Sequence, residues 1–178
     1  GADKLVEALT ASFGSGIRVQ RVPCVGRCDT APIAVVGQNP VDHATPVKVQ
    51  KIVEQNKTKP TVPDYIHYYD YKKHDGYKLL RDCVKGKRDV EAVIAEMEHA
   101  GLRGLGGAGS PTGKKWRIVR AEAGPKLMAV NIDEGEPGTF KDRYYLERDP
   151  HRFLEGMLIA AWAVGIEDIY VYLRDEYA

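Results

Sequence analysis

The sequence predicts an α/β fold, and two observations carry this prediction. Stretches with helical periodicity alternate along the 178 residues with short apolar runs rich in β-branched side chains. Hydrophobic residues make up 43% of the chain and charged residues 29%, a balance typical of a folded protein and not of a disordered one. The net charge of +1 argues against a partner made of nucleic acid. The longest apolar run, 157–166, is about half of the roughly 20 residues that a membrane-spanning helix needs, so no membrane span is expected.

Residues 1–55 predict a small α/β unit. A stripe of apolar side chains over 3–13 predicts a helix, which a glycine then ends. Residues 17–22 alternate between apolar and polar, and 32–37 are apolar and β-branched, so both predict strands. Thr45-Pro46 predicts the N-cap and the first residue of a second helix.

Residues 56–78 are rich in lysine, proline and tyrosine and show no sustained period. This composition predicts a linker or an extended wrapping segment, with the domain boundary inside it. We therefore expect one domain over 1–55 and a second over 79–178. Basic residues predominate over 47–88 and acidic residues over 131–178, which suggests a docking surface.

The sequence of the second domain predicts further helices and strands. Asp89 can cap a helix over 90–100. Strands are expected over 129–132 and 168–173, with a helix over 150–164 between them. Helices and strands that alternate in this way imply an α/β sheet.

A glycine-rich loop over 104–109, GLGGAG, satisfies the pattern GxGxxG. A dinucleotide-binding Rossmann loop follows a strand, whereas the segment before this loop predicts a helix. The pattern therefore does not indicate a Rossmann loop. The glycines let backbone N–H groups approach an anion, Thr112 can cap the next helix, and Lys114 and Lys115 add positive charge. The residues alone leave open a phosphate-binding loop and a plain flexible turn.

Two longer motifs bear on this choice: GLRGLGGAGSPTGKKW over 101–116 and NIDEGEPGTFKD over 131–142. Together they resemble the flavin-binding region of the NADH-oxidising subunit of respiratory complex I. That family includes the diaphorase subunits of soluble NAD-linked formate dehydrogenases and hydrogenases, and the resemblance covers 101–178. It implies that Lys115 lies near the phosphate of flavin mononucleotide (FMN) and that four glycines shape the FMN pocket: Gly104, Gly106, Gly107 and Gly109.

The same resemblance gives roles to the acidic loop after the first strand. Asn131, Asp133 and Glu134 would meet the flavin ring and the ribityl chain, and Glu136 would position NADH. The residues alone are compatible with this, because a strand that ends at Asn131 would deliver the loop to the carboxyl edge of a sheet. The alternative is a solvated surface turn.

Two positions depart from the family. Leu105 stands where arginine is usual, and Ser110 replaces a phenylalanine that helps to stack the adenine of NADH. Serine cannot stack, and an aromatic platform typically contributes about 1–3 kcal/mol per base. The departure therefore affects nucleotide affinity more than flavin binding.

The segment PCVGRCDTAP over 23–32 resembles the second half of the motif that holds a 2Fe-2S cluster in thioredoxin-like ferredoxins. Such a cluster takes four thiolates, so Cys24 and Cys28 would be two of its ligands. A redox dithiol and two unpaired thiols are the alternatives. Cys83 is expected to be a small buried residue. Three cysteines do not suggest a secreted disulfide framework, so a cytoplasmic location is expected.

A partial thioredoxin-like ferredoxin unit directly before an α/β FMN-binding domain is similar to the β subunit of NAD-linked formate dehydrogenases, as is the stretch 141–153. This implies hydride exchange between NAD(H) and FMN, single-electron steps through iron-sulfur clusters, and no residue that acts as acid or base. It also implies a longer fused subunit with a 4Fe-4S cluster beyond this fragment. The expected partners are a molybdenum- or tungsten-containing formate dehydrogenase subunit and other iron-sulfur subunits. Diaphorase subunits of hydrogenases or complex I, and a non-enzymatic electron-transfer module, are the alternatives.

Overall fold

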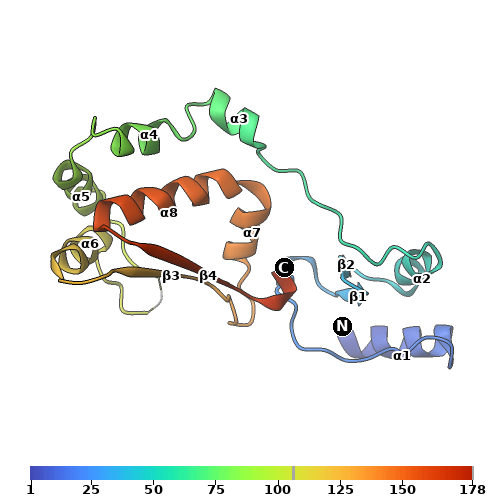
Figure 1. The fold of residues 1–178 in the computed structure, drawn as a ribbon. Coiled ribbons are helices and arrows are strands. Elements are labelled where there is room, and N and C mark those ends of the chain that lie inside the picture. Colours follow the sequence, from blue (N-terminus) through green and yellow to red (C-terminus); the bar gives the residue numbers. More distant parts are fainter. Residues whose placement is uncertain (106, 178) are drawn as a thin grey trace. The chain divides into compact units, whose positions relative to one another are not determined.

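The computed structural model describes residues 1–105 and 107–177, and their contacts divide the chain into two units (Figure 1). Unit 1 consists of Gly1–Asp64, Asp133–Tyr144 and Arg174–Ala178, and unit 2 of Tyr65–Ile132 and Tyr145–Leu173. The chain thus enters unit 1 three times. Within the described ranges, no helix has both the length and the apolar character needed to cross a membrane.

Unit 1 is built on two helices and a short hairpin. In chain order its elements are α1 (Ala2–Phe13), the 3-10 turn η1 (Cys28–Thr30), β1 (Ala34–Val36), β2 (Asn39–Val41), α2 (Pro46–Glu54) and η2 (Asp175–Tyr177). The predicted cap of α2 is confirmed, because the Thr45 hydroxyl accepts the Lys48 N–H at 3.3 Å. The predicted stop of α1 is confirmed too, since the Gly14 N–H closes the last turn on Thr10.

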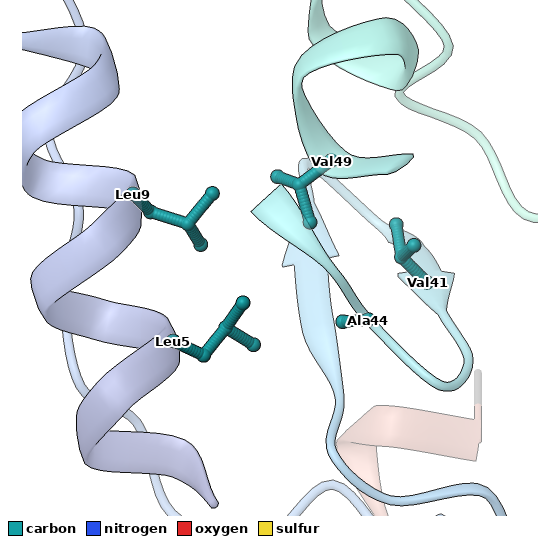
Figure 2. Packing of buried hydrophobic residues seen from close by; sticks show 5 residues of the cluster. All are labelled: Leu5, Leu9, Val41, Ala44 and Val49. Carbon is teal, nitrogen blue, oxygen red and sulfur yellow. The ribbon is translucent and has the colours of Figure 1, made fainter. Parts of the chain in front are cut away.

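The core of unit 1 lies between α1 and the segments that follow the cysteines. Leu5 and Leu9 of α1 face a group of smaller apolar side chains, which are Val41, Ala44 and Val49 (Figure 2). All five are buried. Burial of each larger aliphatic side chain stabilises the fold by about 1.5–3 kcal/mol.

The strand expected over 17–22 is wrong. These residues have no regular structure, and Ile17 and Val22 are exposed by 39% and 61%. Alternation alone does not make a strand, which also needs a neighbouring backbone, and no described strand pairs with this segment. The strand expected over 32–37 is shorter, since only β1 is extended before the turn at Gly37 leads into β2.

Unit 2 combines a group of packed helices with a parallel pair of strands. Its elements are α3 (Tyr68–Lys73), α4 (Lys78–Val84), α5 (Val90–His99), α6 (Thr112–Ala121), β3 (Leu127–Ile132), the end of α7 (Lys141–Arg148), α8 (Pro150–Val164) and β4 (Asp168–Leu173). α8 packs against α3, α4, α5 and α6. β3 and β4 pair in parallel, from Leu127 opposite Asp168 to Ile132 opposite Leu173. The expected α/β sheet is confirmed as this two-stranded pair.

The segment 56–78 contains α3, for which its sequence shows no helical period. Glu155 of α8 explains the helix: its carboxylate accepts the Tyr71 hydroxyl at 2.6 Å and the Tyr77 N–H at 2.8 Å. These contacts reach across more than 75 residues and therefore leave no local signal. Cys83 of α4 is buried, as expected. The role of 56–78 as the linker between two domains stays a prediction.

Candidate functional site

The acidic loop, residues 133–140, joins the end of β3 to the start of α7. Glu134 anchors this loop: its side chain is buried, and its backbone has a left-handed φ of 44°. One carboxylate oxygen accepts the Asp142 N–H at 2.9 Å, and the other accepts the Arg143 N–H at 3.2 Å and the Tyr177 hydroxyl at 2.8 Å. Glu134 therefore caps the first turn of α7 from outside the helix.

These contacts shift two pKa values in opposite directions. Burial opposes the ionisation of Glu134, but the hydrogen bonds from α7 and Tyr177 and the charge of Lys141 hold its pKa below the ordinary value. Burial, followed by the hydrogen bond to Glu134, raises the pKa of Tyr177. At neutral pH the pair is therefore a carboxylate and a protonated phenol.

Glu134→Gln should lower the free energy of unfolding of the full-length protein at pH 7 by about 1.5–3 kcal/mol, because the amide offers one oxygen where two N–H groups need acceptors. The folded pKa of Glu134 is depressed, so its contribution is present above the unfolded value of about 4.3 and is lost as the pH falls through the folded value. Urea unfolding of both proteins at several pH values measures this. Glu136→Gln, at an exposed position, is the control. A difference that does not shrink toward low pH would contradict the capping role.

Glu136 begins a tight turn. The Thr139 N–H donates to the Glu136 carbonyl at 3.1 Å, with Pro137 and Gly138 between them, and Gly138 has a φ of 88°. Proline followed by a left-handed glycine is the signature of a type II turn. The turn leaves the Glu136 side chain exposed, while Asp133 is half-buried.

The two cysteines of the predicted cluster motif lie together in unit 1. Cys24 is exposed, Cys28 is half-buried, and their sulfur atoms are 3.7 Å apart. Thiolates that bind one tetrahedral metal at about 2.3 Å are separated by about 3.8 Å, so the pair fits a shared iron atom. Among the described residues, no group of three or more histidine, cysteine or acidic side chains could hold a metal ion. The pair can therefore supply two of the four ligands.

Two arginines hold the cysteine loop, residues 24–30. Arg174 donates to the Cys24 carbonyl at 2.7 Å and to the Glu134 carbonyl at 2.9 Å. Arg143, which is almost fully buried, donates to the Gly26 carbonyl at 3.1 Å and pairs with Asp29. The cysteine loop and the acidic loop are thus fastened to each other within unit 1.

Tyr177 packs directly against the cysteine loop. A Cβ added at Gly26 would lie 2.6 Å from the Tyr177 hydroxyl oxygen, so this close approach requires a glycine. The Arg174 guanidinium lies 5.7 Å from the Tyr177 ring centre. Burial opposes the charge on Arg174, but Glu176, Tyr177 and Cys24 raise its pKa above the ordinary value.

The sequence patterns did not reveal the segment 174–177. A signal for it exists, because two equally long parallel strands place the residues after their ends close together. β3 ends at Ile132 and β4 at Leu173, and these two residues are register partners. An arginine directly after β4 could therefore have been expected near the acidic loop.

The glycine loop lies in unit 2, and its base is closed by two hydrogen bonds. The Gly104 N–H donates to the Ser110 carbonyl and the Arg103 guanidinium to the Gly109 carbonyl, both at 2.9 Å. Gly107 and Gly109 have φ values of 103° and 61°, and a Cβ at either would meet no described atom within 4 Å. This open backbone fits the close approach of an anionic ligand. Gly106 lies outside the described residues.

The helix after the glycine loop differs by one residue from the prediction. Pro111 occupies the N-cap position and Thr112 is the first helical residue, with no hydrogen bond from a side chain to the described helix start. Threonine is therefore not the cap, because the proline before it takes the extended conformation. Lys114 and Lys115 are exposed in this first turn. The Thr112 N–H donates to the Leu102 carbonyl at 2.8 Å, so the dipole of α6 and the two lysines are what fit a phosphate here.

Gly113 lets the first turn of α6 pack closely against α5. A Cβ at this position would lie 2.6 Å from the Glu98 backbone nitrogen of α5, so only glycine allows the two helices to approach so closely. Arg117 of α6 also pairs with Glu91 and Glu98 of α5. The first turns of α6 are therefore held against α5 within unit 2.

The predicted site residues are divided between the two units. Unit 2 contains Gly104, Gly107, Gly109, Lys115 and the exposed Asn131, and unit 1 contains Asp133, Glu134 and Glu136. Of the two departures, Leu105 is 86% exposed and Ser110 is exposed.

Each of the two parts of the chain matches a known protein family. Residues 97–178 match the Nuo51 FMN-binding domain, and residues 5–57 match the thioredoxin-like 2Fe-2S ferredoxin family. The expectations of an FMN-binding domain and of a thioredoxin-like 2Fe-2S unit are thereby confirmed. The glycine loop, the acidic loop and Cys24 with Cys28 lie inside these matches.

The chain is also similar to individual proteins. It is 47% identical over 117 residues to a component of the NADH-quinone oxidoreductase of Rhizobium meliloti. This alignment covers 65% of the chain and 28% of that protein. It is 38% identical over 144 residues to the 51 kDa subunit of NADH-ubiquinone oxidoreductase of Neurospora crassa. This alignment covers 78% of the chain and 28% of that subunit. A solved NAD+-reducing [NiFe]-hydrogenase in the air-oxidized state matches 99% of this chain and 35% of its own, with 31% identity and a TM-score of 0.73. The chain thus spans about a third or less of these relatives.

Proposed function

We propose that this chain, one part of which matches the Nuo51 FMN-binding domain and the other a thioredoxin-like 2Fe-2S ferredoxin, belongs to a diaphorase-type subunit. In this function hydride passes between NAD(H) and FMN, and single electrons pass to iron-sulfur clusters. The observation that carries the proposal is that both matches occur in one chain. A single chain of an NAD+-reducing hydrogenase covers 99% of the sequence and so contains both parts in the same order.

The glycine loop would bind the flavin phosphate. Open backbone at Gly107 and Gly109, together with Lys115 in the first turn of α6, favours a phosphate there. FMN, when bound, supplies a hydride acceptor and a change from two-electron to one-electron transfer. The work of the protein is then to bind and orient, and no residue is assigned as acid or base.

The acidic loop would orient the ring system and the nicotinamide nucleotide. Asn131 and Glu136 are exposed and Asp133 is half-buried, so solvent, and therefore a ligand, can reach these three residues. Glu134 differs from these, because both of its carboxylate oxygens already accept hydrogen bonds within unit 1. We assign to Glu134 a role through its backbone and through the shape of the loop.

The decisive experiment for this proposal measures flavin and its reduction. The full-length subunit is purified without air, its FMN is quantified, and NADH is added while the flavin absorbance is followed. FMN that is bleached by NADH supports the diaphorase function. Bound FMN that NADH does not bleach would favour a non-enzymatic electron-transfer module, and a protein without FMN would contradict the proposal.

We further propose that the partner is the catalytic subunit of an NAD-linked formate dehydrogenase. The stretch 141–153, which resembles the β subunit of that enzyme, supports this assignment. The likeness to the hydrogenase chain supports a hydrogenase as the second candidate. Mass spectrometry of the proteins that purify with the full-length subunit distinguishes the two by identifying either a molybdenum- or tungsten-type subunit or a nickel-iron subunit.

Ser110→Phe tests where the nucleotide binds. If adenine lies beside this position, a restored stacking face should contribute about 1–2 kcal/mol and lower the NADH dissociation constant roughly 5- to 30-fold. Flavin content should stay the same. Stopped-flow bleaching of bound FMN over a series of NADH concentrations gives the affinity separately from the rate of hydride transfer. An unchanged affinity at full flavin occupancy would show that Ser110 is not a weakened contact.

A further inference from the structure

The structure brings a single side chain into contact with both cofactor motifs of unit 1. Arg174 donates one hydrogen bond to the Cys24 carbonyl, at 2.7 Å, and another to the Glu134 carbonyl, at 2.9 Å. The first is the backbone of a proposed cluster ligand, and the second belongs to the proposed flavin loop. The fork of the guanidinium allows both bonds at once.

The guanidinium is held firmly in this position. Arg174 is 12% exposed, and both Nε and Nη2 bond the Glu176 carboxylate, at 3.2 and 3.3 Å. Solvent therefore screens its charge only weakly. Arg143 fastens the other side of the cysteine loop through Gly26 and Asp29, but the structure shows no hydrogen bond from it to the backbone of Cys24 or Cys28 among the described contacts.

We propose that Arg174 is a positioning residue that fastens the cysteine loop to the acidic loop, and that its positive charge raises the reduction potential of the cluster held by Cys24 and Cys28. This inference rests on the proposed function, because it requires the 2Fe-2S cluster. Reduction adds one electron to a cluster and makes its net charge more negative. A fixed cation beside the ligand backbone favours the reduced state, since net charge and hydrogen bonding set the potentials of such clusters.

The ion pair between Arg174 and Glu176 determines the direction in which each substitution should change the reduction potential. Arg174→Gln removes a positive charge and leaves Glu176 unpaired, and both changes make the surroundings of the cluster more negative. Glu176→Gln removes the opposing charge and should move the potential the other way. Arg174→Lys keeps the charge, but a compact ammonium group cannot hold both carbonyls in the same fork.

The test is a redox titration of the 2Fe-2S signal by electron paramagnetic resonance, with the full-length subunit and its variants. Arg174→Gln should lower the reduction equilibrium constant at least tenfold, which is 59 mV for one electron. Arg174→Lys should stay within threefold of the unsubstituted protein, while amide hydrogen exchange over 24–28 and 133–136 becomes faster. Glu176→Gln should raise the potential. The control is Arg117→Gln, which breaks ion pairs with Glu91 and Glu98 in unit 2. It should leave the reduction potential of the 2Fe-2S cluster unchanged.

An unchanged reduction potential in Arg174→Gln with the cluster intact would overturn the inference. A fall in potential in Arg174→Lys as large as that in Arg174→Gln would overturn it too. If Arg174→Gln assembles no cluster, the other two variants decide: a lysine variant with normal potential and a raised potential in Glu176→Gln support the inference, and any other result overturns it. Absence of a 2Fe-2S signal from the unsubstituted protein is a separate outcome. It would refute the cluster assignment in the proposed function.

Discussion

Cys24→Ser and Cys28→Ser should each abolish one two-iron signal in the electron paramagnetic resonance spectrum of the full-length subunit. The two sulfur atoms are 3.7 Å apart, a separation that fits two thiolates on one iron, and a hydroxyl group is a poor substitute for a thiolate. We expect the iron content to fall with the signal. Loss of a single ligand leaves the cluster incompletely held, so the effect should be a loss and not a shift.

Cys83→Ala is the matched control for this experiment. Cys83 is buried in α4 of unit 2 and should leave the two-iron signal unchanged. Both serine variants with unaltered spectra and full iron content would refute the ligand assignment. A disulfide that links Cys24 to Cys28 in the purified, air-free protein would instead support the redox dithiol.

Gly107→Val should empty the flavin site. The backbone at Gly107 has a φ of 103°, and no described atom lies within 4 Å of an added Cβ, so a side chain would occupy the space where a ligand approaches. A weakening of FMN binding by at least tenfold, which is about 1.4 kcal/mol, is expected. Flavin content of the purified protein and FMN titration of the apoprotein measure it.

The same substitution at Gly124 separates the loss of ligand space from backbone strain. Gly124 also has a positive φ, of 90°, and an added Cβ there also meets no described atom. Valine costs about 1–3 kcal/mol of strain at either position, but only Gly107 belongs to the proposed site. Normal FMN content in Gly107→Val would show that the glycine loop is only a turn, and equal losses in both variants would point to strain.

Elements with local signals were predictable from the sequence. α8 begins after Asp149, whose carboxylate accepts the Arg152 N–H, and ends at Gly165 with a left-handed backbone, so its predicted range of 150–164 is confirmed. α5 has the same kind of start, since Asp89 accepts the Ala92 N–H at 2.9 Å. In both helices the cap and the apolar period lie within a few residues of each other.

Elements that depend on distant contacts were not predictable. The cap of α7 is Glu134, which lies outside the helix, and the anchor of α3 is Glu155 of α8. The error at 17–22 has the opposite origin, because a local period was present but no described strand pairs with this segment. The cysteine pair and the glycine loop could be found from sequence, whereas Arg174 acts across 150 positions and could not be found by motif.

The three-part composition of unit 1 has a consequence for the order of folding. On a ribosome the cysteine loop emerges before 133–144 and 174–177, so its contacts with these two segments must wait for them. Closing a long loop costs little more than closing a moderate one, about 0.6 kcal/mol for each doubling of length, so the delay is one of time and not of stability. Contacts of such high sequence separation form slowly. Arg143 can fasten the cysteine loop first, through Gly26 and Asp29, whereas the Cys24 end of the loop stays unfastened until Arg174 is synthesised.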